Sequence, residues 1–285
     1  MKKKLIITGS VLLGIIITVI ILCFTVFTVK TVEVDFRTST TQAWSEEEIV
    51  ENSKIPYGKC LLFMSKDQFV NNLETKYPYI EVINIEKVFP SKMVIHCVER
   101  EELYVMQNGE DVVYLDKDFK VLKIEQALFE SQKTNPILLE DLSYQGEIEV
   151  GKVLSIDQTA MKRFYASMLE NNKNLSQVLG FCKEISFEDE FNTLTKSNET
   201  HITIQTFGER KVKILNISTN LNYKIQKVFQ TIPMLYETLV DNGDYTTEEV
   251  DRCEIIVGNQ IIDKNELYVH VCLDVQTITS PTKNE

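Results

Sequence analysis

The feature that most constrains this chain is an uncharged run at residues 5–29, which follows directly after Lys2–Lys4. At the α-helical rise this run would measure about 37 Å, against about 30 Å for the hydrocarbon core of a bilayer. The run therefore predicts a transmembrane helix over residues 5–29. The lysines before it predict a short cytoplasmic tail at residues 1–4, because positive charge favours the cytoplasmic side. Everything from Lys30 onward is then expected outside the cytoplasmic membrane.

A cleaved signal peptide is the alternative interpretation of this segment, since it begins with the same charge pattern. The apolar run exceeds the usual signal-peptide length of about 7–15 residues, and no small residues spaced for cleavage follow it. Residues 27–30 read Phe-Thr-Val-Lys where alanines would be expected. We therefore expect an uncleaved anchor. Its Ser10 and Gly14 fit either a helix-packing pair or incidental small residues.

The charge of residues 30–285 limits the partners of this part of the chain. It holds 27 of the 30 basic residues and all 42 acidic ones, a net charge of −15. Such a surface repels nucleic acid, whose binding needs clustered Lys and Arg. It favours solubility or a partner with a basic strip.

The six cysteines do not form the pattern of a disulfide framework. One lies in the apolar run and five lie beyond it at irregular spacing, so they cannot all pair. Several stand in apolar runs, where a free cysteine behaves as a small buried hydrophobe. A single bridge remains open among Cys60, Cys97, Cys182, Cys253 and Cys272.

Residues 30–100 predict a small α+β domain. Alternation at residues 32–36 indicates a strand, and Ser45 followed by Glu48 is a capping-box pattern that begins a helix ending before Pro56. A second helix is expected from Ser65 or Asp67 to Pro78. Alternating strands at 82–88 and 93–98 complete the order strand, helix, helix, strand, strand.

Residues 101–274 predict a larger, mostly antiparallel β domain with two helices. Asn108-Gly109 between apolar runs is a strong hairpin signal. Helices are expected over 157–171, and from about Asn220 to Pro233, which ends or kinks a helix. Residues 275–285 are polar and are expected to form a flexible tail. A second hairpin is expected at 201–215, turning at Gly208-Glu209, and further strands at 121–124, 136–139, 185–187, 253–257 and 266–274.

An anchor, a strand-helix-helix-strand-strand module and a β-rich domain together resemble the FtsQ/DivIB cell-division family. The residues that carry the resemblance are Ile55-Pro56-Tyr57-Gly58, Tyr77-Pro78-Tyr79-Ile80, Val88-Phe89-Pro90-Ser91, Val98-Glu99-Arg100 and Tyr114-Leu115-Asp116. The helix from Asn220, with Lys224 inside it, resembles the one before the family's final strands. The resemblance implies that residues 30–100 are a POTRA-like domain and that 101–274 are the family's β domain.

Three positions depart from the family pattern. Asp35-Phe36-Arg37 replaces a glycine usually expected after the first strand, and Glu102 stands where a proline is common. Phe119 stands where a glycine often follows the aspartate of the hairpin. These departures affect loop details and leave the predicted topology unchanged.

The sequence offers no catalytic or cofactor motif. Neither a nucleophile elbow nor a glycine-rich phosphate loop is present, so we expect no enzyme activity and no cofactor. His270 and Cys272 share one face of a predicted strand, but a structural zinc requires four ligands. We therefore expect no metal site.

The C-terminal strand is the candidate partner-binding site, formed by Leu267, Tyr268, Val269, His270, Val271 and Cys272. If this strand ends the sheet, its free edge can accept an added strand from another protein. The resemblance implies partners of the FtsB/DivIC and FtsL types, both small bitopic division proteins. The alternative is an ordinary sheet strand covered by its own chain.

The pair Glu99 and Arg100 closes the first predicted domain. We favour an exposed ion pair of small energetic value at the domain boundary. The alternative is a role in orienting the two domains.

These features predict a single-pass, non-enzymatic scaffold of the bacterial divisome, located at the septum, which supports septal cell-wall synthesis. Two other functions remain open. A POTRA protein of a secretion or transport system would carry repeated modules, and none is visible. A membrane-tethered surface hydrolase would react with a broad covalent probe.

Overall fold

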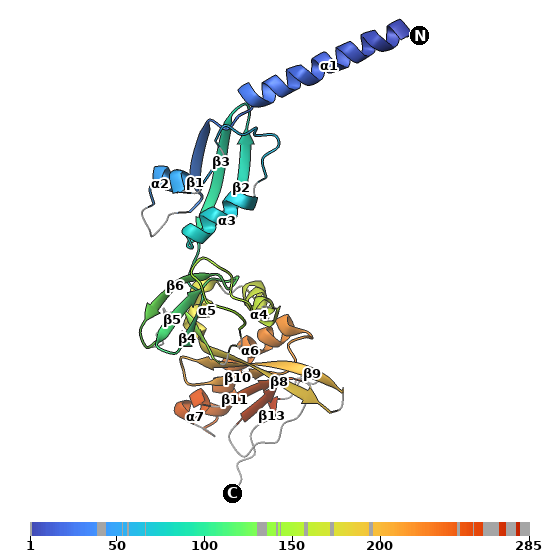
Figure 1. The fold of residues 1–285 in the computed structure, drawn as a ribbon. Coiled ribbons are helices and arrows are strands. Elements are labelled where there is room, and N and C mark those ends of the chain that lie inside the picture. Colours follow the sequence, from blue (N-terminus) through green and yellow to red (C-terminus); the bar gives the residue numbers. More distant parts are fainter. Residues whose placement is uncertain are drawn as a thin grey trace. The chain divides into compact units, whose positions relative to one another are not determined.

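The structure is a computed structural model of two compact units, residues 1–101 with 150–152 and residues 102–149 with 153–285. Figure 1 shows the elements of each unit. The structure describes the backbone but not the side chains at residues 2–8, 67–68, 175, 238–239, 268–271 and 278–279. The described residues are 2–38, 44–52, 54–55, 57–65, 67–129, 136–140, 142, 144–156, 159–171, 174–193, 196–243, 246–252, 254–258, 268–271 and 278–279.

The first unit contains a three-stranded sheet with two helices. Its strands are β1 (Thr31–Phe36), β2 (Ile80–Val88) and β3 (Lys92–Glu99), and its short helices are α2 (Glu46–Asn52) and α3 (Asp67–Lys76). The sheet order is β1-β3-β2, with β1 parallel and β2 antiparallel to β3. The predicted order of strand, helix, helix, strand, strand is confirmed, as is the α+β class.

Alternation along β3 decides which face of this sheet is covered. Met93, Ile95 and Cys97 are fully buried, whereas the residues between them are partly exposed. Ile49 of α2 and Leu73 of α3 are equally buried and belong to the same core. The two helices therefore cover one face of the sheet, because each presents a single apolar stripe.

The predicted transmembrane helix over residues 5–29 is corrected by the structure. Helix α1 spans Lys2–Thr25, so the residues predicted as a cytoplasmic tail are helical from Lys2. Among the described residues, no helix is both long and apolar enough to cross a bilayer.

The last residues of the predicted span belong to the folded first unit instead of the helix. Thr28 forms a β-bridge with Cys60, and the backbone N–H of Val29 donates to the carbonyl of Lys59 at 3.0 Å. Val29 is 1% exposed and packs in the core of this unit. An uncharged sequence run therefore contains two different structures, a helix and the start of a sheet core.

The second unit contains one sheet with the order β13-β12-β11-β10-β9-β8-β7-β4-β5-β6. The predicted hairpin at Asn108-Gly109 is confirmed, with β4 antiparallel to β5. The strands are β4 (Tyr104–Asn108), β5 (Asp111–Leu115), β6 (Val121–Gln126), β7 (Ile137–Leu139), β8 (Cys182–Asn192), β9 (Ser197–Thr206), β10 (Lys211–Ile214), β11 (Glu254–Val257), β12 (Tyr268–Val271) and β13 (Ile278–Thr279).

This sheet is mixed: five of its nine described strand pairs are antiparallel, in line with the predicted majority, and four are parallel. The parallel pairs are β4 with β7, β7 with β8, β10 with β11, and β11 with β12. A parallel pair requires a crossover connection, and helices supply two of these crossovers. Helices α4 and α5 connect β7 to β8, and α6 to α7 connect β10 to β11.

The prediction of two helices is also too low. The described residues contain α4 (Thr159–Glu170), α5 (Leu175–Phe181), α6 (Leu221–Leu235), the π-helical turn η1 (Tyr236–Val240) and α7 (Thr247–Arg252). Pro233 lies inside α6, which continues to Leu235. α5 begins with a capping box between Asn174 and Gln177.

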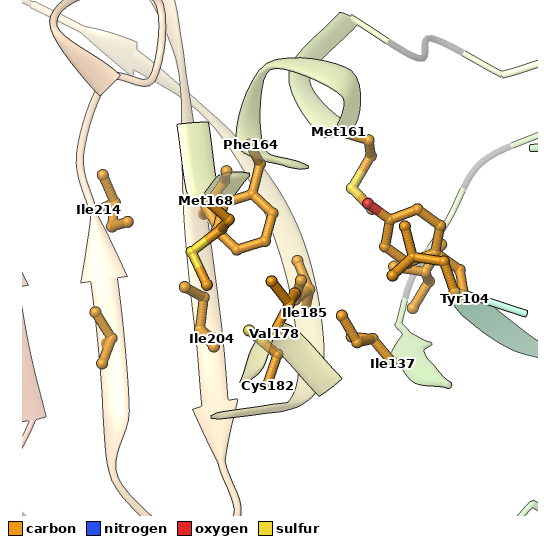
Figure 2. Close-up of a cluster of buried hydrophobic side chains, with 14 of the residues drawn as sticks. Tyr104, Ile137, Met161, Phe164, Met168, Val178, Cys182, Ile185, Ile204 and Ile214 are labelled. Carbon is orange, nitrogen blue, oxygen red and sulfur yellow. The ribbon is translucent and has the colours of Figure 1, made fainter. Parts of the chain in front are cut away.

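Helices α4 and α6 contribute to the main core of the second unit. Phe164 and Met168 of α4, together with Ile225 of α6, pack with buried strand residues such as Ile185 and Ile204. Figure 2 shows Phe164 and Met168 beside these strand residues. Each of these side chains is at most 2% exposed.

The turn after β5 contains a strained residue. Phe119 has φ 64°, a left-handed conformation that disfavours a side chain, yet it is fully buried and stacks on Tyr104 with ring centroids 5.2 Å apart. Asp116 stabilises the turn, since its Oδ1 accepts hydrogen bonds from the backbone N–H groups of Asp118 and Lys120, both at 2.8 Å. This conformation explains why a glycine suits the position that Phe119 occupies here.

Candidate functional site

The C-terminal end of the large sheet contains the strand that the sequence predicts as a partner-binding site. β11 lies between β10 and β12 and is parallel to both. Its Ile255, Ile256 and Val257 are fully buried, as expected for a strand covered on both faces. β11 therefore gives β12 a fixed support, in the register Glu254 to Tyr268 through Val257 to Val271.

The structure describes four of the six predicted site residues. Tyr268, Val269, His270 and Val271 form β12, whereas Leu267 and Cys272 lie outside the described residues. Of His270 and Cys272, which share one face of the predicted strand, only His270 lies within the described residues. The partner-binding role of these residues stays a prediction.

β12 is not the outermost strand of the sheet, because the chain adds β13 beyond it. His270 pairs with Thr279 and Val271 with Ile278, in antiparallel orientation. The prediction assumed that the C-terminal strand itself ends the sheet. Part of its outer side is instead paired with a two-residue strand of the same chain.

A buried lysine stabilises the loop that connects β10 to α6. Lys224 is 3% exposed, and its Nζ donates to the carbonyl oxygens of Leu215 at 2.8 Å and Asn216 at 2.5 Å. Burial lowers the pKa of this amine to about 8, and the nearby carboxylate of Glu199 opposes the shift. The ammonium thus donates hydrogen bonds to two carbonyl groups of the loop before α6. Burial of its charge opposes this stabilisation.

His201 of β9 holds the same loop from the sheet side. Its Nδ1 accepts a hydrogen bond from the backbone N–H of Asn216 at 2.9 Å, and its Nε2 lies 3.2 Å from Glu190 Oε2. In the neutral ring, Nε2 must then carry the hydrogen and donate a hydrogen bond to the carboxylate of Glu190. The backbone N–H of Leu215 also donates to the carbonyl of Val257 at 2.9 Å, which ties the loop to β11.

A buried arginine fixes the helix before β11. Arg210 is 6% exposed, and one of its terminal nitrogens donates to Tyr236 Oη and to the carbonyl of Val250, both at 3.0 Å. The same nitrogen lies 3.4 Å from Asp251 Oδ1, and the Tyr236 hydroxyl bonds that carboxylate too. These contacts join the β9–β10 turn to η1 and α7.

Sequence reasoning did not identify Arg210 or the role of Lys224. Lys224 stands within the apolar stripe of a helix, next to Ile225, and a lysine in that place indicates a buried amine that needs acceptors. Arg210 follows a Gly-Glu turn and has no comparable local signal. Its partners come from elements that only the tertiary structure brings together.

Arg100 is buried in the first unit and forms an ion pair with Glu74. Its side chain is 7% exposed, and one terminal nitrogen lies 2.9 Å from Glu74 Oε2 of α3. Its Nε donates to the carbonyl of Ile80 at 3.3 Å, and Glu74 Oε1 accepts the N–H of Val82 at 2.9 Å. This buried pair belongs to the first unit and joins α3 to β2. Glu99 is the last residue of β3 and is in register with Ile80. The alternative role of Glu99 and Arg100, orienting the two domains, stays a prediction.

The described residues offer little reactive chemistry. Among them, no group of three or more His, Cys, Asp and Glu side chains is arranged to hold a metal ion. His96 of β3 lies between two carboxylates, with Nδ1 2.8 Å from Asp35 Oδ2 and Nε2 3.3 Å from Glu86 Oε2. It links the three strands across the outer face of the small sheet.

Comparison with known proteins gives the class of the molecule. Residues 27–100 match the family model described as a POTRA domain of the FtsQ type. These bounds contain the whole three-stranded sheet and both of its helices. The first unit therefore carries a POTRA domain, followed in the chain by a mixed α/β unit.

The relatives found by comparison are cell-division proteins. The chain is 26% identical over 178 residues to "Cell division protein DivIB" of Clostridium botulinum (strain Loch Maree / Type A3), covering 60% of this chain and 64% of that relative. It is 26% identical over 80 residues to the DivIB protein of Clostridium acetobutylicum, covering 28% and 32%. The chain thus matches less than two thirds of the length of these relatives. Together with the POTRA match, these similarities support the resemblance to the FtsQ/DivIB family that the sequence indicates.

Proposed function

We propose that this protein is a non-enzymatic scaffold of the bacterial division assembly, which binds small partners of the FtsB/DivIC and FtsL types and supports septal cell-wall synthesis. Similarity to proteins named as cell-division proteins, together with the POTRA domain, supports the division role. The single observation that supports the binding site is that β12 lies near the end of the sheet and is followed there only by β13, a described strand of two residues.

The proposed interaction is addition of a partner strand along the outer side of β12. Backbone hydrogen bonds would give affinity, and side chains of alternate residues would give selectivity. β13 pairs with His270 and Val271, and no pairing with Tyr268 or Val269 is described on that side. A partner strand that follows all four residues replaces β13, because both need the same backbone groups.

The supporting elements favour a strand platform that stays fixed during binding. The three apolar residues of β11 are fully buried, and Lys224, His201 and Arg210 fix the loop and the helix on either side of this strand. Strand addition to a rigid edge loses less conformational entropy than addition to a loose one. The POTRA domain would serve a separate contact with other division proteins, and the assembly would place the protein at the septum.

A Tyr-to-Lys pair of variants tests this site. The full chain is mixed with a purified FtsB/DivIC-type protein from the same organism, and the dissociation constant is measured for Tyr268→Lys and for Tyr223→Lys. Tyr223 lies on α6, is 43% exposed and serves as the matched control. We expect Tyr268→Lys to weaken binding at least about tenfold, which corresponds to about 1.4 kcal/mol.

The Tyr223→Lys control is expected to bind like the unmodified chain. Equal affinities of the two variants would remove β12 from the proposed site. No binding by the unmodified chain would reject the partner type. Septal localisation is tested separately, with a fluorescent fusion of the full chain in dividing cells.

A further inference from the structure

Two cysteines that are distant in the sequence meet at the junction of α1 and the POTRA domain. Cys23 lies near the end of α1, and Cys60 lies in the segment between α2 and α3. Both are free thiols, and Cys60 lies close enough to Cys23 to raise the pKa of the Cys23 thiol, in addition to the larger effect of burial. Cys23 is 5% exposed, whereas Cys60 is only partly buried.

Backbone hydrogen bonds hold these two segments together. Residues 27–29 run antiparallel to residues 58–61, with a bridge between Thr28 and Cys60. The N–H of Leu61 donates to the carbonyl of Phe27 at 2.6 Å, and the N–H of Gly58 donates to the carbonyl of Val29 at 3.1 Å. Cys60 therefore occupies a fixed position in a short ribbon.

The end of α1 is fixed onto the same ribbon. The N–H groups of Val26 and Phe27 both donate to the carbonyl of Leu22, at 2.9 and 3.0 Å, so the chain passes directly from the helix into the ribbon. The Phe27 ring also packs edge-on against Phe89, with centroids 5.9 Å apart. Contact between the two thiols is thus a consequence of local backbone structure on both sides.

We propose that Cys23 and Cys60 form a reversible dithiol–disulfide site that locks the end of α1 to the POTRA domain when a low-molecular-weight disulfide is present. The bridge closes a covalent loop that contains β1 and α2. Such a loop restricts the unfolded chain and holds the helix end in its folded position.

The reaction proceeds by two thiol–disulfide exchanges. The Cys60 thiolate, as the more exposed sulfur, attacks one sulfur of oxidised glutathione, forms a mixed disulfide and releases one glutathione thiolate. The Cys23 thiolate then attacks Cys60 Sγ, forms the protein disulfide and releases the second glutathione. Two cysteine thiols are oxidised, one glutathione disulfide is reduced to two thiols, and the two protons go to the released thiolates.

The positions of the groups assign the order of the two steps. Burial raises the pKa of the Cys23 thiol, and the neighbouring Cys60 acts in the same direction. Cys23 is therefore a poor first nucleophile, but its contact with Cys60 gives the second, intramolecular step a high effective concentration.

The other cysteines with described side chains are poor competitors. Cys97 and Cys182 are both 0% exposed and belong to the cores of different units. Burial raises the pKa of Cys97 to about 12 and raises that of Cys182 strongly. Oxidation of the folded chain is therefore expected to select the pair of Cys23 and Cys60 over these two.

Oxidised glutathione applied to the reduced, folded full chain tests the site, with peptide mapping by mass spectrometry under non-reducing conditions. We expect a peptide pair linked through Cys23 and Cys60, and an intact mass lower by two hydrogens. Reduction should restore both thiols. Recovery of both cysteines as free thiols, or as separate glutathione adducts, would overturn the proposal.

Single variants test the order of steps and do not depend on a stability change. In Cys23→Ser the second nucleophile is missing, so Cys60 should retain a glutathione adduct. In Cys60→Ser we expect Cys23 to stay unmodified, since it is buried. A Cys23 adduct forming in Cys60→Ser as fast as the Cys60 adduct forms in Cys23→Ser would refute the assigned order. Circular dichroism of each reduced variant checks that the comparison is made on folded protein.

Discussion

Replacement of Lys224 by methionine removes a buried cation while keeping a similar length of apolar side chain. The change leaves the carbonyl oxygens of Leu215 and Asn216 without the ammonium, whose hydrogen bonds to them measure 2.8 and 2.5 Å. A buried acceptor that loses its partner costs about 1–3 kcal/mol, which applies to Leu215. The carbonyl of Asn216 adds less, because it also accepts hydrogen bonds from the N–H and the hydroxyl of Thr219 at 3.4 and 3.5 Å. Removing a buried charge offsets part of this loss, because the charged amine is itself disfavoured by burial.

We therefore expect Lys224→Met to lower the free energy of unfolding of the second unit by about 2 kcal/mol. Chemical denaturation followed by circular dichroism measures this change. Lys227→Met is the matched control, since Lys227 lies on the same helix and is only partly buried, with its ammonium 5.2 Å from the Tyr223 ring. The control should differ from the unmodified chain by less than about 0.5 kcal/mol.

The pH dependence gives this prediction a second readout. The pKa of Lys224 falls from 10.5 to about 8 on folding, so between these values the unfolded chain binds one more proton than the folded chain. Stability contributed by this group therefore rises with pH from about 8 to about 10.5. The difference between the unmodified chain and Lys224→Met should grow as the pH rises through this window. Equal stability of Lys224→Met and Lys227→Met at every pH would refute the assigned role.

Three further predictions follow from other sites. Phe119→Gly relieves about 1–2 kcal/mol of left-handed backbone strain but loses about 3–5 kcal/mol from burial of the aromatic ring. The free energy of unfolding, measured by urea denaturation, should therefore fall by about 2 kcal/mol, and a rise would contradict this prediction. Arg100→Met leaves Glu74 buried without its cation and should destabilise the POTRA domain by about 3 kcal/mol, measured by thermal unfolding; Glu74→Gln with Arg100→Met should recover part of it. Truncation after Asp274 removes β13 and should tighten binding of an FtsB/DivIC-type protein, compared with truncation after Ser280, which keeps β13. Weaker binding by the chain that ends at Asp274 than by the chain that ends at Ser280 would show that β13 is needed for the interaction.

The POTRA domain was well predicted because its signals are local. Alternating apolar residues define β1 and β3, and Ser45 caps α2 through the N–H of Glu48 at 3.4 Å. The two missed helices had local signals as well. Thr246 and Glu249 form a reciprocal cap before α7, just as Asn174 and Gln177 do before α5. Short helices with such caps are therefore predictable from sequence, although their apolar stripes are too short to be noticed.

The α+β order of the first unit, the Asn108-Gly109 hairpin and the resemblance to the FtsQ/DivIB family are predictable from the sequence, because each depends on residues that are close together along the chain. The end of α1, the order of the ten described strands and the groups that Lys224 and Arg210 contact became known from the three-dimensional structure. Strand order and buried ion contacts depend on pairing between distant segments, and a periodic pattern gives the face of a strand but not its neighbour. The pairing of β13 with β12 is such a case, since two residues in a polar tail carry no detectable strand signal.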